Sequence, residues 1–152
     1  MKRLVSFGLW AFALAVPGQA AAQTAQQFDA VCEIRNSYSN SELEESDPDR
    51  RGEETLQLRF RIDTQSRTFC VDTCRGGIFD IGTSESVSDL NLTHFGFFIY
   101  RGEQRRSREP NVVVLNRQSG AISFAHRQGS FRSSGAGTCR REPFSGFPEA
   151  VF

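Results

Sequence analysis

The stretch TLQLRFRID at Thr55–Asp63 decides the fold that this sequence predicts. Within it, every second residue is apolar, and the residues between are polar or charged. The apolar positions are Leu56, Leu58, Phe60 and Ile62, and the polar positions between them are Gln57, Arg59 and Arg61. Because side chains alternate between the two faces of a β-strand, this pattern predicts an antiparallel strand with one buried face.

The residues on either side extend the prediction to a hairpin and a first strand. Asp63–Ser66 is rich in turn-forming residues and is followed by a returning strand at Arg67–Val71. Upstream, Phe28–Ile34 contains several β-forming residues. Between these strands, Asn36–Glu54 (NSYSNSELEESDPDRRGEE) has very few apolar side chains and therefore predicts a polar loop.

Further short strands are predicted downstream, and none of the sequence after residue 22 repeats its apolar residues with a helical period. The predicted strands are Ile78–Ile81, Val87–Leu92, Phe95–Tyr100, Asn111–Asn116, Ala121–His126 and Ser130–Ser133. Gly102–Pro110 predicts a charged loop, and Asn116–Gly120 predicts a turn with Gly120 in a left-handed conformation. We expect an all-β fold, a single antiparallel β-barrel or β-sandwich of about seven to eight short strands stapled by disulfides.

Met1–Ala22 has the features of a secretory signal peptide. Two basic residues precede the apolar run Leu4–Val16, and small residues follow at Ala20–Ala22. This run is shorter than the roughly 20 apolar residues of a membrane-spanning helix. We therefore expect residues 1–22 to be cleaved and residues 23–152 to form one β domain. That domain would be periplasmic or secreted, without a transmembrane segment.

All four cysteines, Cys32, Cys70, Cys74 and Cys139, follow the predicted signal, which favours disulfides in an oxidising compartment. Four cysteines allow three connectivities. We favour Cys70–Cys74, which would close the tight turn CVDTC, and Cys32–Cys139, which would tie the first strand to the end of the chain. A redox motif usually has two residues between its cysteines, and no histidine lies close enough in sequence to complete a zinc site.

The charge balance is neutral, with 18 basic and 18 acidic residues, and gives no general attraction to nucleic acid. The densest positive charge is at Arg105, Arg106 and Arg108, our candidate partner-contact residues. With Arg140 and Arg141 they would hold an anionic ligand or an acidic partner surface. Acidic residues bracket the first group, however, which favours a solvated hairpin tip. We expect no nucleic-acid partner, since aromatic residues do not interleave with these arginines.

No pattern of catalytic residues is recognised. The two histidines, His94 and His126, lie outside any G-x-S-x-G or H-E-x-x-H motif. His126 shares a strand face with Ile122 and Phe124, which favours a core position. We therefore expect a protein that is not an enzyme, with no catalytic, cofactor-binding or metal-binding residues and no cofactor.

Several motifs occur in a familiar order along the chain. These are F-x-x-x-C at Phe28–Cys32, C-x-x-x-C at Cys70–Cys74, Asn116-Arg117-x-x-Gly120, Gly137-Thr138-Cys139 and Phe144–Pro148. In this order the chain resembles small exported four-cysteine β proteins of unknown function from Gram-negative bacteria. The resemblance implies neither an activity nor site residues, and the long acidic insert departs from the pattern.

A looser similarity concerns Ser119-Gly120-Ala121, which is similar to the serine–glycine-rich inhibitory loop of periplasmic lysozyme inhibitors. Those proteins are small exported β-barrels. Two hypotheses follow. In the first, the chain is an exported, non-enzymatic envelope protein that binds a protein partner or a small ligand. In the alternative, it inhibits a secreted or periplasmic hydrolase such as lysozyme through Gly102–Pro110 or Asn116–Gly120.

Overall fold

A computed structural model describes residues 26–48, 50–101 and 103–148, and nearly all of them lie in or between β-strands. Nine strands are described in this part of the chain. They are β1 (Gln27–Asn40), β2 (Arg51–Asp63), β3 (Thr68–Val71), β4 (Phe79–Asp80), β5 (Asp89–Asn91), β6 (His94–Tyr100), β7 (Glu103–Asn116), β8 (Ala121–Gln128) and β9 (Phe131–Glu142). This confirms the all-β prediction. The predicted signal peptide, residues 1–22, lies outside the described residues.

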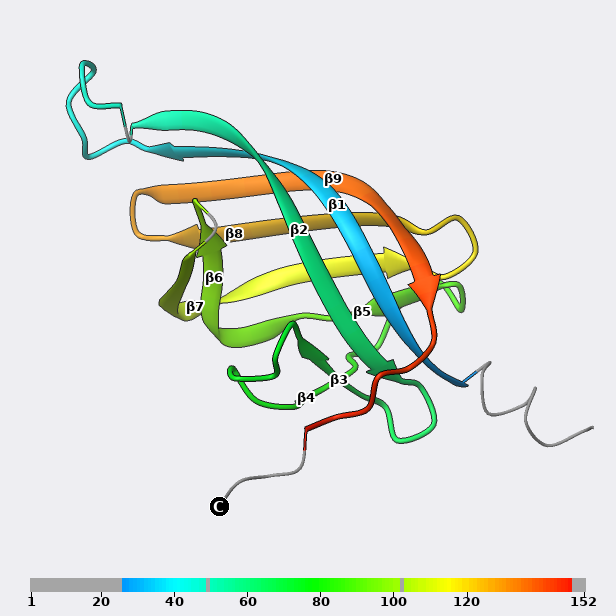
Figure 1. The fold of residues 1–152 in the computed structure, drawn as a ribbon. Helices are drawn as coiled ribbons and strands as arrows, with labels where there is room; N and C mark the ends of the chain where they lie inside the picture. Colours follow the sequence, from blue (N-terminus) through cyan, green and yellow to red (C-terminus); the bar gives the residue numbers. More distant parts are fainter. Residues whose placement is uncertain (1–25, 49, 102, 149–152) are drawn as a thin grey trace, which may run out of the picture.

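The strands form one antiparallel sheet rather than two packed sheets. Its order is β4-β3-β2-β1-β9-β8-β7-β5, and β6 pairs with the first half of β7. The sheet curls into a half-barrel, with β1 and β2 crossing in front of β7, β8 and β9 in Figure 1. A single β-bridge between Gly82, just after β4, and Asn91 of β5 connects the two ends of this order.

Two glycines in β9 allow it to pack closely between β1 and β8. A Cβ atom at Gly137 would lie 1.9 Å from the main-chain oxygen of Glu33 in β1. At Gly135 it would lie 2.5 Å from the ring of Phe124 and 2.6 Å from the main-chain oxygen of Arg35. Only glycine fits such close approaches, and glycines at such points let a sheet bend sharply.

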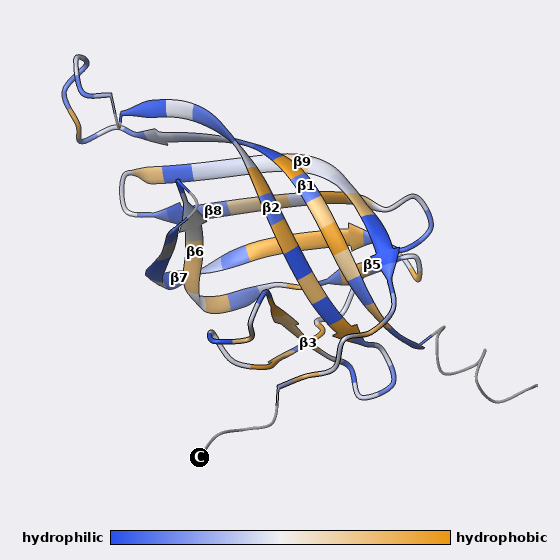
Figure 2. Ribbon diagram, viewed as in Figure 1, coloured by the Kyte–Doolittle hydropathy of each residue, from blue (hydrophilic) through white to orange (hydrophobic). Residues whose placement is uncertain are grey.

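The concave face of the curled sheet carries the apolar core. In Figure 2, hydrophobic and hydrophilic residues alternate along β2, as the sequence predicted. Leu56, Phe60 and Ile62 are buried, with exposed fractions of 4%, 1% and 0%, and Leu58 packs against them partly buried. The other strands and the residues that directly follow β4 and β5 contribute Phe28, Ala30, Cys32, Ile34, Phe69, Val71, Ile81, Leu90, Leu92, Phe97, Val113, Leu115 and Ile122.

The predicted polar loop at Asn36–Glu54 is wrong at both ends. β1 continues to Asn40, and β2 begins at Arg51, so only residues 41–50 connect them. The polar side chains misled the prediction because main-chain pairing between β1 and β2 extends the strands here without apolar contacts. The amide nitrogen Nδ2 of Asn36 donates to the carboxylate of Glu54 over 2.8 Å.

The predicted loop at Gly102–Pro110 is also wrong, because β7 begins at Glu103 and pairs with β6. Its charged side chains are exposed on a hairpin strand, where they need no apolar partners. The predicted strand at Ser130–Ser133 is too short, since β9 runs from Phe131 to Glu142. The pairing of β9 with β1 and β8 along its length replaces the apolar alternation that the sequence lacks.

Candidate functional site

Both predicted disulfides form. Cys32 of β1 and Cys139 of β9 are directly opposite one another, with their Cα atoms 3.9 Å apart. Cys70, at the end of β3, is bonded to Cys74 and closes the turn between them. No free cysteine is present among the described residues. Disulfides of this kind are typical of proteins of oxidising compartments. Within the same residues, no helix has the length and apolar character needed to cross a membrane.

The interior of the half-barrel is filled by side chains. A cavity lined in part by Leu56, Phe60, His94, Phe97 and Asn111 measures about 10 Å³. This is room for about one water molecule, whereas sites for organic ligands occupy about 300–1,000 Å³. A ligand or partner larger than water therefore has to bind at the surface clefts rather than under the concave face.

A row of buried polar residues, which we call the polar belt, crosses the concave face beyond the apolar core. His94 of β6 is opposite Asn111 of β7, and Asn111 is opposite His126 of β8. His126 is in turn opposite Ser133 of β9, whose hydroxyl donates to Asn36 of β1 over 2.7 Å. All five are at least nine-tenths buried. The sequence did not reveal this row because its members come from five strands.

His94 lies in an aromatic environment. Its ring centroid is 4.6 Å from that of Phe97 and 5.3 Å from that of Phe79. Nδ1 is 3.2 Å from the main-chain oxygen of Leu92, which only accepts, so Nδ1 carries the hydrogen. Nε2 then accepts from the amide of Asn111 over 3.4 Å, and the Asn111 oxygen has no partner. Burial lowers the pKa of His94.

His126 is stacked on Phe98, with the ring centroids 4.4 Å apart. Its Nδ1 is 3.4 Å from the main-chain oxygen of Pro110, and its Nε2 is 3.5 Å from the hydroxyl of Ser107. Burial lowers the pKa of His126, and the charge of Glu109 acts weakly in the opposite direction. In the described residues, neither imidazole is hydrogen-bonded to a carboxylate, as a serine–histidine–acid triad would need.

A surface cleft of about 490 Å³ lies at the opposite end of the sheet, which we call the cleft end. The start of β1, the end of β9, the β7–β8 turn and residues 87–88 line it. Its lining includes three arginines, Arg117, Arg140 and Arg141, beside the apolar side chains of Phe28 and Leu115. None of the described residues lining this cleft is acidic.

Each of these arginines is held by a neighbour. The guanidinium of Arg141 lies over the ring of Phe28, 4.3 Å from its centroid. Arg140 forms an ion pair with Glu142 over 2.7 Å, and the guanidinium of Arg117 donates to the main-chain oxygen of Val87. A guanidinium has five N–H donors, so these contacts position the three groups and leave Arg117 and Arg140 further donors for a bound anion.

The Asn116–Gly120 turn forms one wall of this cleft and is fixed by the side chain of Asn116. Its Oδ1 accepts from the main-chain nitrogens of Gln118 and Ser119 over 3.1 Å and 2.9 Å and from the Ser119 hydroxyl over 3.0 Å. Its Nδ2 donates to Asp89 over 2.8 Å. Gly120 has the predicted left-handed conformation, with φ of 72°, and accepts from the main-chain nitrogen of the disulfide-bonded Cys139.

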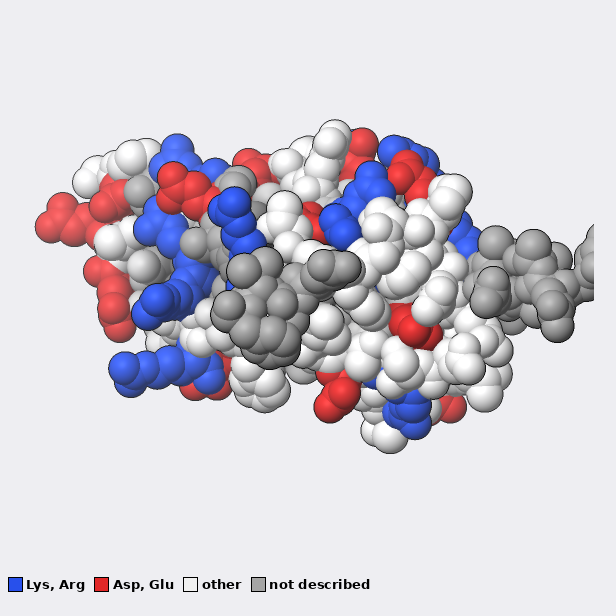
Figure 3. Space-filling view, turned by 60° about the horizontal axis from the view of Figure 1, so that its bottom comes forward, with Lys and Arg blue, Asp and Glu red and all other residues white. Residues whose placement is uncertain are grey.

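The candidate partner-contact residues Arg105, Arg106 and Arg108 lie on β7 at the other end of the sheet, away from Arg140 and Arg141. All three are exposed. Arg105 pairs with Glu103 over 2.8 Å and lies 5.9 Å from the ring centroid of Tyr100. Figure 3 shows basic and acidic side chains mixed at this end of the molecule. The structure therefore separates the two arginine groups that the sequence analysis considered together.

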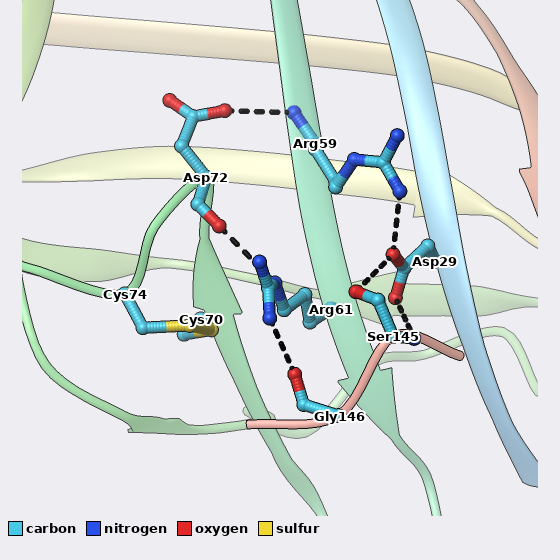
Figure 4. Close-up of a disulfide and its surroundings, with 8 residues drawn as sticks. All are labelled: Asp29, Arg59, Arg61, Cys70, Asp72, Cys74, Ser145 and Gly146. Atoms are coloured by element: carbon cyan, nitrogen blue, oxygen red, sulfur yellow. Dashed lines mark hydrogen bonds and ion pairs between the residues drawn. A yellow bond between two sulfur atoms is a disulfide. The ribbon is translucent and has the colours of Figure 1, made fainter. Parts of the chain in front are cut away.

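The C-terminal segment 143–148 lies across the outer face of the sheet and contacts side chains of β1 and β2, as Figure 4 shows. The fully buried carboxylate of Asp29 accepts from Arg59 and from both the main-chain nitrogen and the hydroxyl of Ser145. Arg61 donates to the main-chain oxygens of Gly146 and Asp72. Through this network, residues 143–148 pack onto the sheet. We interpret it as structural, since every polar group of Asp29 faces a partner within the fold.

In the ranges that the structure describes, no group of three or more histidine, cysteine, aspartate or glutamate residues is placed to hold a metal ion. No protein-family model, curated protein or solved structure matches this chain significantly. The resemblances drawn from the sequence therefore stay predictions, and the proposals below rest on the geometry of the clefts and the turn.

Proposed function

We propose that the chain is an exported, non-enzymatic binding protein. It binds a protein partner through the cleft end, at the Asn116–Gly120 turn and the adjoining residue Val87. The size of the interior cavity, about 10 Å³, argues against the alternative of a small organic ligand inside the half-barrel. The export signal predicted from the sequence and the two disulfides support an oxidising compartment outside the cytoplasm.

The observation that carries this proposal is the hydrogen bonding of the turn by Asn116. Binding through a loop costs conformational entropy when the loop must be ordered, so a loop already fixed in the free protein binds at a lower cost. The main-chain nitrogen of Arg117 also donates to the main-chain oxygen of Ser88 over 2.7 Å, which ties the turn to the neighbouring loop. Turn and loop therefore present one fixed surface.

The side chains of this surface are available to a partner. Arg117, Gln118 and Ser119 are exposed, and Val87 is the most exposed of the large hydrophobic residues in the described chain, at 88%. A partner can bury this apolar side chain, while the polar residues around it form the rim of the contact.

A second candidate function is the inhibition of a secreted or periplasmic hydrolase such as lysozyme. The same turn favours it, because an inhibitory loop must stay ordered while it occupies the active-site cleft of an enzyme. Of the two loops expected from the sequence, the first lies in strand β7 from Glu103 onward, which leaves Asn116–Gly120 as the candidate. A titration against a panel of lysozymes and proteases tests this function, and unchanged activity across the panel would exclude it.

The binding function is tested by site-specific photo-crosslinking in the envelope of the host. A photoreactive residue at position 118 is compared with one at position 128, the exposed last residue of β8 at the other end of the sheet. We expect a discrete adduct from position 118 that is absent from position 128. Equal adducts from both positions, or none from position 118, would contradict the proposal.

The partner identified in this way is then purified and titrated with the Asn116→Ala variant. Removing the Asn116 side chain loosens the turn without changing its exposed residues, so we expect the affinity to fall by about tenfold or more. The Gln128→Ala variant is the matched control and should bind as the unmodified chain does. An unchanged affinity for Asn116→Ala would show that the fixed turn is not the binding element.

A further inference from the structure

We infer that the cleft lined by Arg117, Arg140 and Arg141 is a carboxylate-binding subsite for an acidic segment of the protein partner. This inference rests on the proposed function, since it assigns a chemistry to the same surface. The three arginines come from two distant parts of the sequence, and the turn and the end of β9 bring them to one cleft. They differ from Arg105, Arg106 and Arg108, which line a hairpin strand beside acidic residues.

The charge of this cleft is not neutralised by its own lining. Among the described lining residues there are three arginines and no aspartate or glutamate. Glu142, the ion-pair partner of Arg140, also binds Arg59 over 3.0 Å, so one carboxylate is shared between two guanidinium groups. Arg117 donates to a neutral main-chain oxygen. An excess of positive charge therefore faces the space of the cleft.

The shape and lining of the cleft favour a carboxylate side chain over a bare inorganic anion. The apolar side chains of Phe28, Ala30 and Leu115 lie beside the arginines and suit the methylene groups of glutamate. Planar guanidinium groups bind a carboxylate through two parallel hydrogen bonds. A volume of about 490 Å³ accommodates several atoms beyond the charged group itself.

A second hollow continues this surface and suits an extended segment. It measures about 370 Å³ and shares Val87 and Arg117 with the first cleft. The shared residues form the divide between the two hollows, so a chain lying across them would pass the Arg117 guanidinium and the exposed Val87 side chain. The second hollow is lined by both Arg67 and Asp89, so it does not select for negative charge. The ligand we assign is thus an extended peptide that places a glutamate or aspartate side chain in the first cleft.

The test is calorimetric titration of the purified chain with a hexaglutamate peptide, with hexaglutamine and inorganic phosphate as comparison ligands. We expect hexaglutamate to bind, hexaglutamine to bind at least about tenfold more weakly, and the binding to weaken as salt is raised. Equal binding of the two peptides would overturn the inference. Binding of phosphate without hexaglutamate would also overturn it and would identify a phosphate site.

Variants of the cleft locate the binding. We expect Arg117→Gln and Arg140→Gln each to weaken hexaglutamate binding by about tenfold, because each removes a charge-assisted contact. The matched control is Arg127→Gln with Arg132→Gln, which changes another surface cleft of about 430 Å³ at the far end of the sheet. An equal loss in the control would overturn the assignment. Circular dichroism and melting temperatures of the variants establish that they fold.

The proposed function and the carboxylate subsite can each be disproved without disproving the other. If hexaglutamate does not bind but the crosslink from position 118 forms, the chain is a binding protein whose partner is not acidic. If hexaglutamate binds but no crosslink forms, the anion subsite stands as a property of the cleft, and the partner-binding function through the turn is wrong.

Discussion

The two ends of the curled sheet are built on different physical principles. At the cleft end, the Cys32–Cys139 disulfide and the hydrogen bonds of Asn116 hold an exposed turn. At the other end, which contains the polar belt and which we call the belt end, buried polar groups such as His94 and His126 are paired with neutral partners. The first end depends on a disulfide and on the hydrogen bonds of a neutral side-chain amide, whereas the second depends on imidazoles that stay uncharged.

This difference explains why the binding surface is proposed at one end and not at the other. A fixed, exposed turn beside an arginine cleft loses little entropy on association. The belt end buries its polar groups from any partner, and its exposed arginines are paired with or bracketed by acids. The predictions that follow separate the contributions of the two ends, starting from the covalent restraint.

The largest expected effect comes from replacing Cys32 and Cys139 together by alanine. Their sequence separation is 107 residues, and closing a loop of that length stabilises the folded chain by about 4–5 kcal/mol in the chain-entropy model. Denaturation by guanidinium chloride measures the loss. The double replacement of Cys70 and Cys74, separated by 4 residues, is the control, with an expected loss of about 2 kcal/mol. Equal losses for both pairs would contradict the loop-length argument.

The next largest effect is expected at Gly120, and it is compared with that at Gly129. The two glycines lie in turns at opposite ends of the sheet. Gly120 has φ of 72°, and a Cβ atom there would lie 2.5 Å from the main-chain oxygen of Cys139. Gly129 in the β8–β9 turn has φ of 58°, and a Cβ atom would meet nothing within 4 Å. We expect Gly120→Ala to cost about 3 kcal/mol, from the strained conformation and the clash together.

Gly129→Ala should lower the free energy of unfolding only through the strained left-handed conformation, by about 1 kcal/mol. The difference between the two variants in chemical denaturation therefore measures how tightly the Asn116–Gly120 turn is packed on β9. If both substitutions cost the same, the close approach to Cys139 contributes nothing, and the turn is less restrained than the structure indicates.

The sequence predicted the parts of this fold that are stabilised by apolar alternation. The strand at Thr55–Asp63, both disulfides and the turn at Gly120 all leave local signals, because one face, one spacing or one glycine identifies each. β9 left no such signal, since Gly135 and Gly137 occupy core positions that in other strands hold large apolar residues. The pairing partners of a strand, and not its own composition, define it there.

The candidate site was predictable only in part for a similar reason. Arg140 and Arg141 were recognised as a local pair, and Arg117 was not, because it is brought to them by the packing of the β7–β8 turn against β9. The polar belt was missed altogether, since each strand contributes a single polar residue to it. A single polar residue in an apolar pattern does not reveal which residues lie beside it.

Acid should lower the contribution that the buried histidines of the belt end make to the free energy of unfolding. The disulfide of the cleft end should keep its contribution. Burial lowers the pKa of both His94 and His126 in the folded chain, so the unfolded chain binds more protons below its histidine pKa of about 6.5. Stability is therefore fully present above about pH 6.5 and falls as the pH is lowered towards the folded-state pKa values. The slope is at most about 1.4 kcal/mol per pH unit for each histidine.

Urea denaturation at pH 7 and pH 5 measures this loss, and the His94→Gln and His126→Gln variants identify its source. Each variant should lose less stability over that interval than the unmodified chain. Asp63, whose pKa is lowered by hydrogen bonds from Gln27 and Ser66 despite its desolvation, loses its contribution below about pH 4, outside the interval. Burial raises the pKa of Asp72, so this carboxyl stabilises the folded chain as the pH falls, opposite to the effect of the histidines. Its effect is the same in every variant. An unchanged slope in both variants would refute the assignment to the belt.

The smallest expected effect on stability gives the sharpest comparison of the two ends. Arg105 and Arg140 each form an exposed ion pair on a strand, with Glu103 and Glu142, and their side chains are 53% and 71% exposed. Because exposed ion pairs contribute little, we expect Arg105→Gln and Arg140→Gln each to change the free energy of unfolding by less than about 1 kcal/mol. Only Arg140→Gln should weaken hexaglutamate binding, since only Arg140 faces a cleft without acidic lining. If Arg105→Gln weakened binding as much, the anion would be attracted by the overall charge of the protein, and the arrangement of the cleft would not matter.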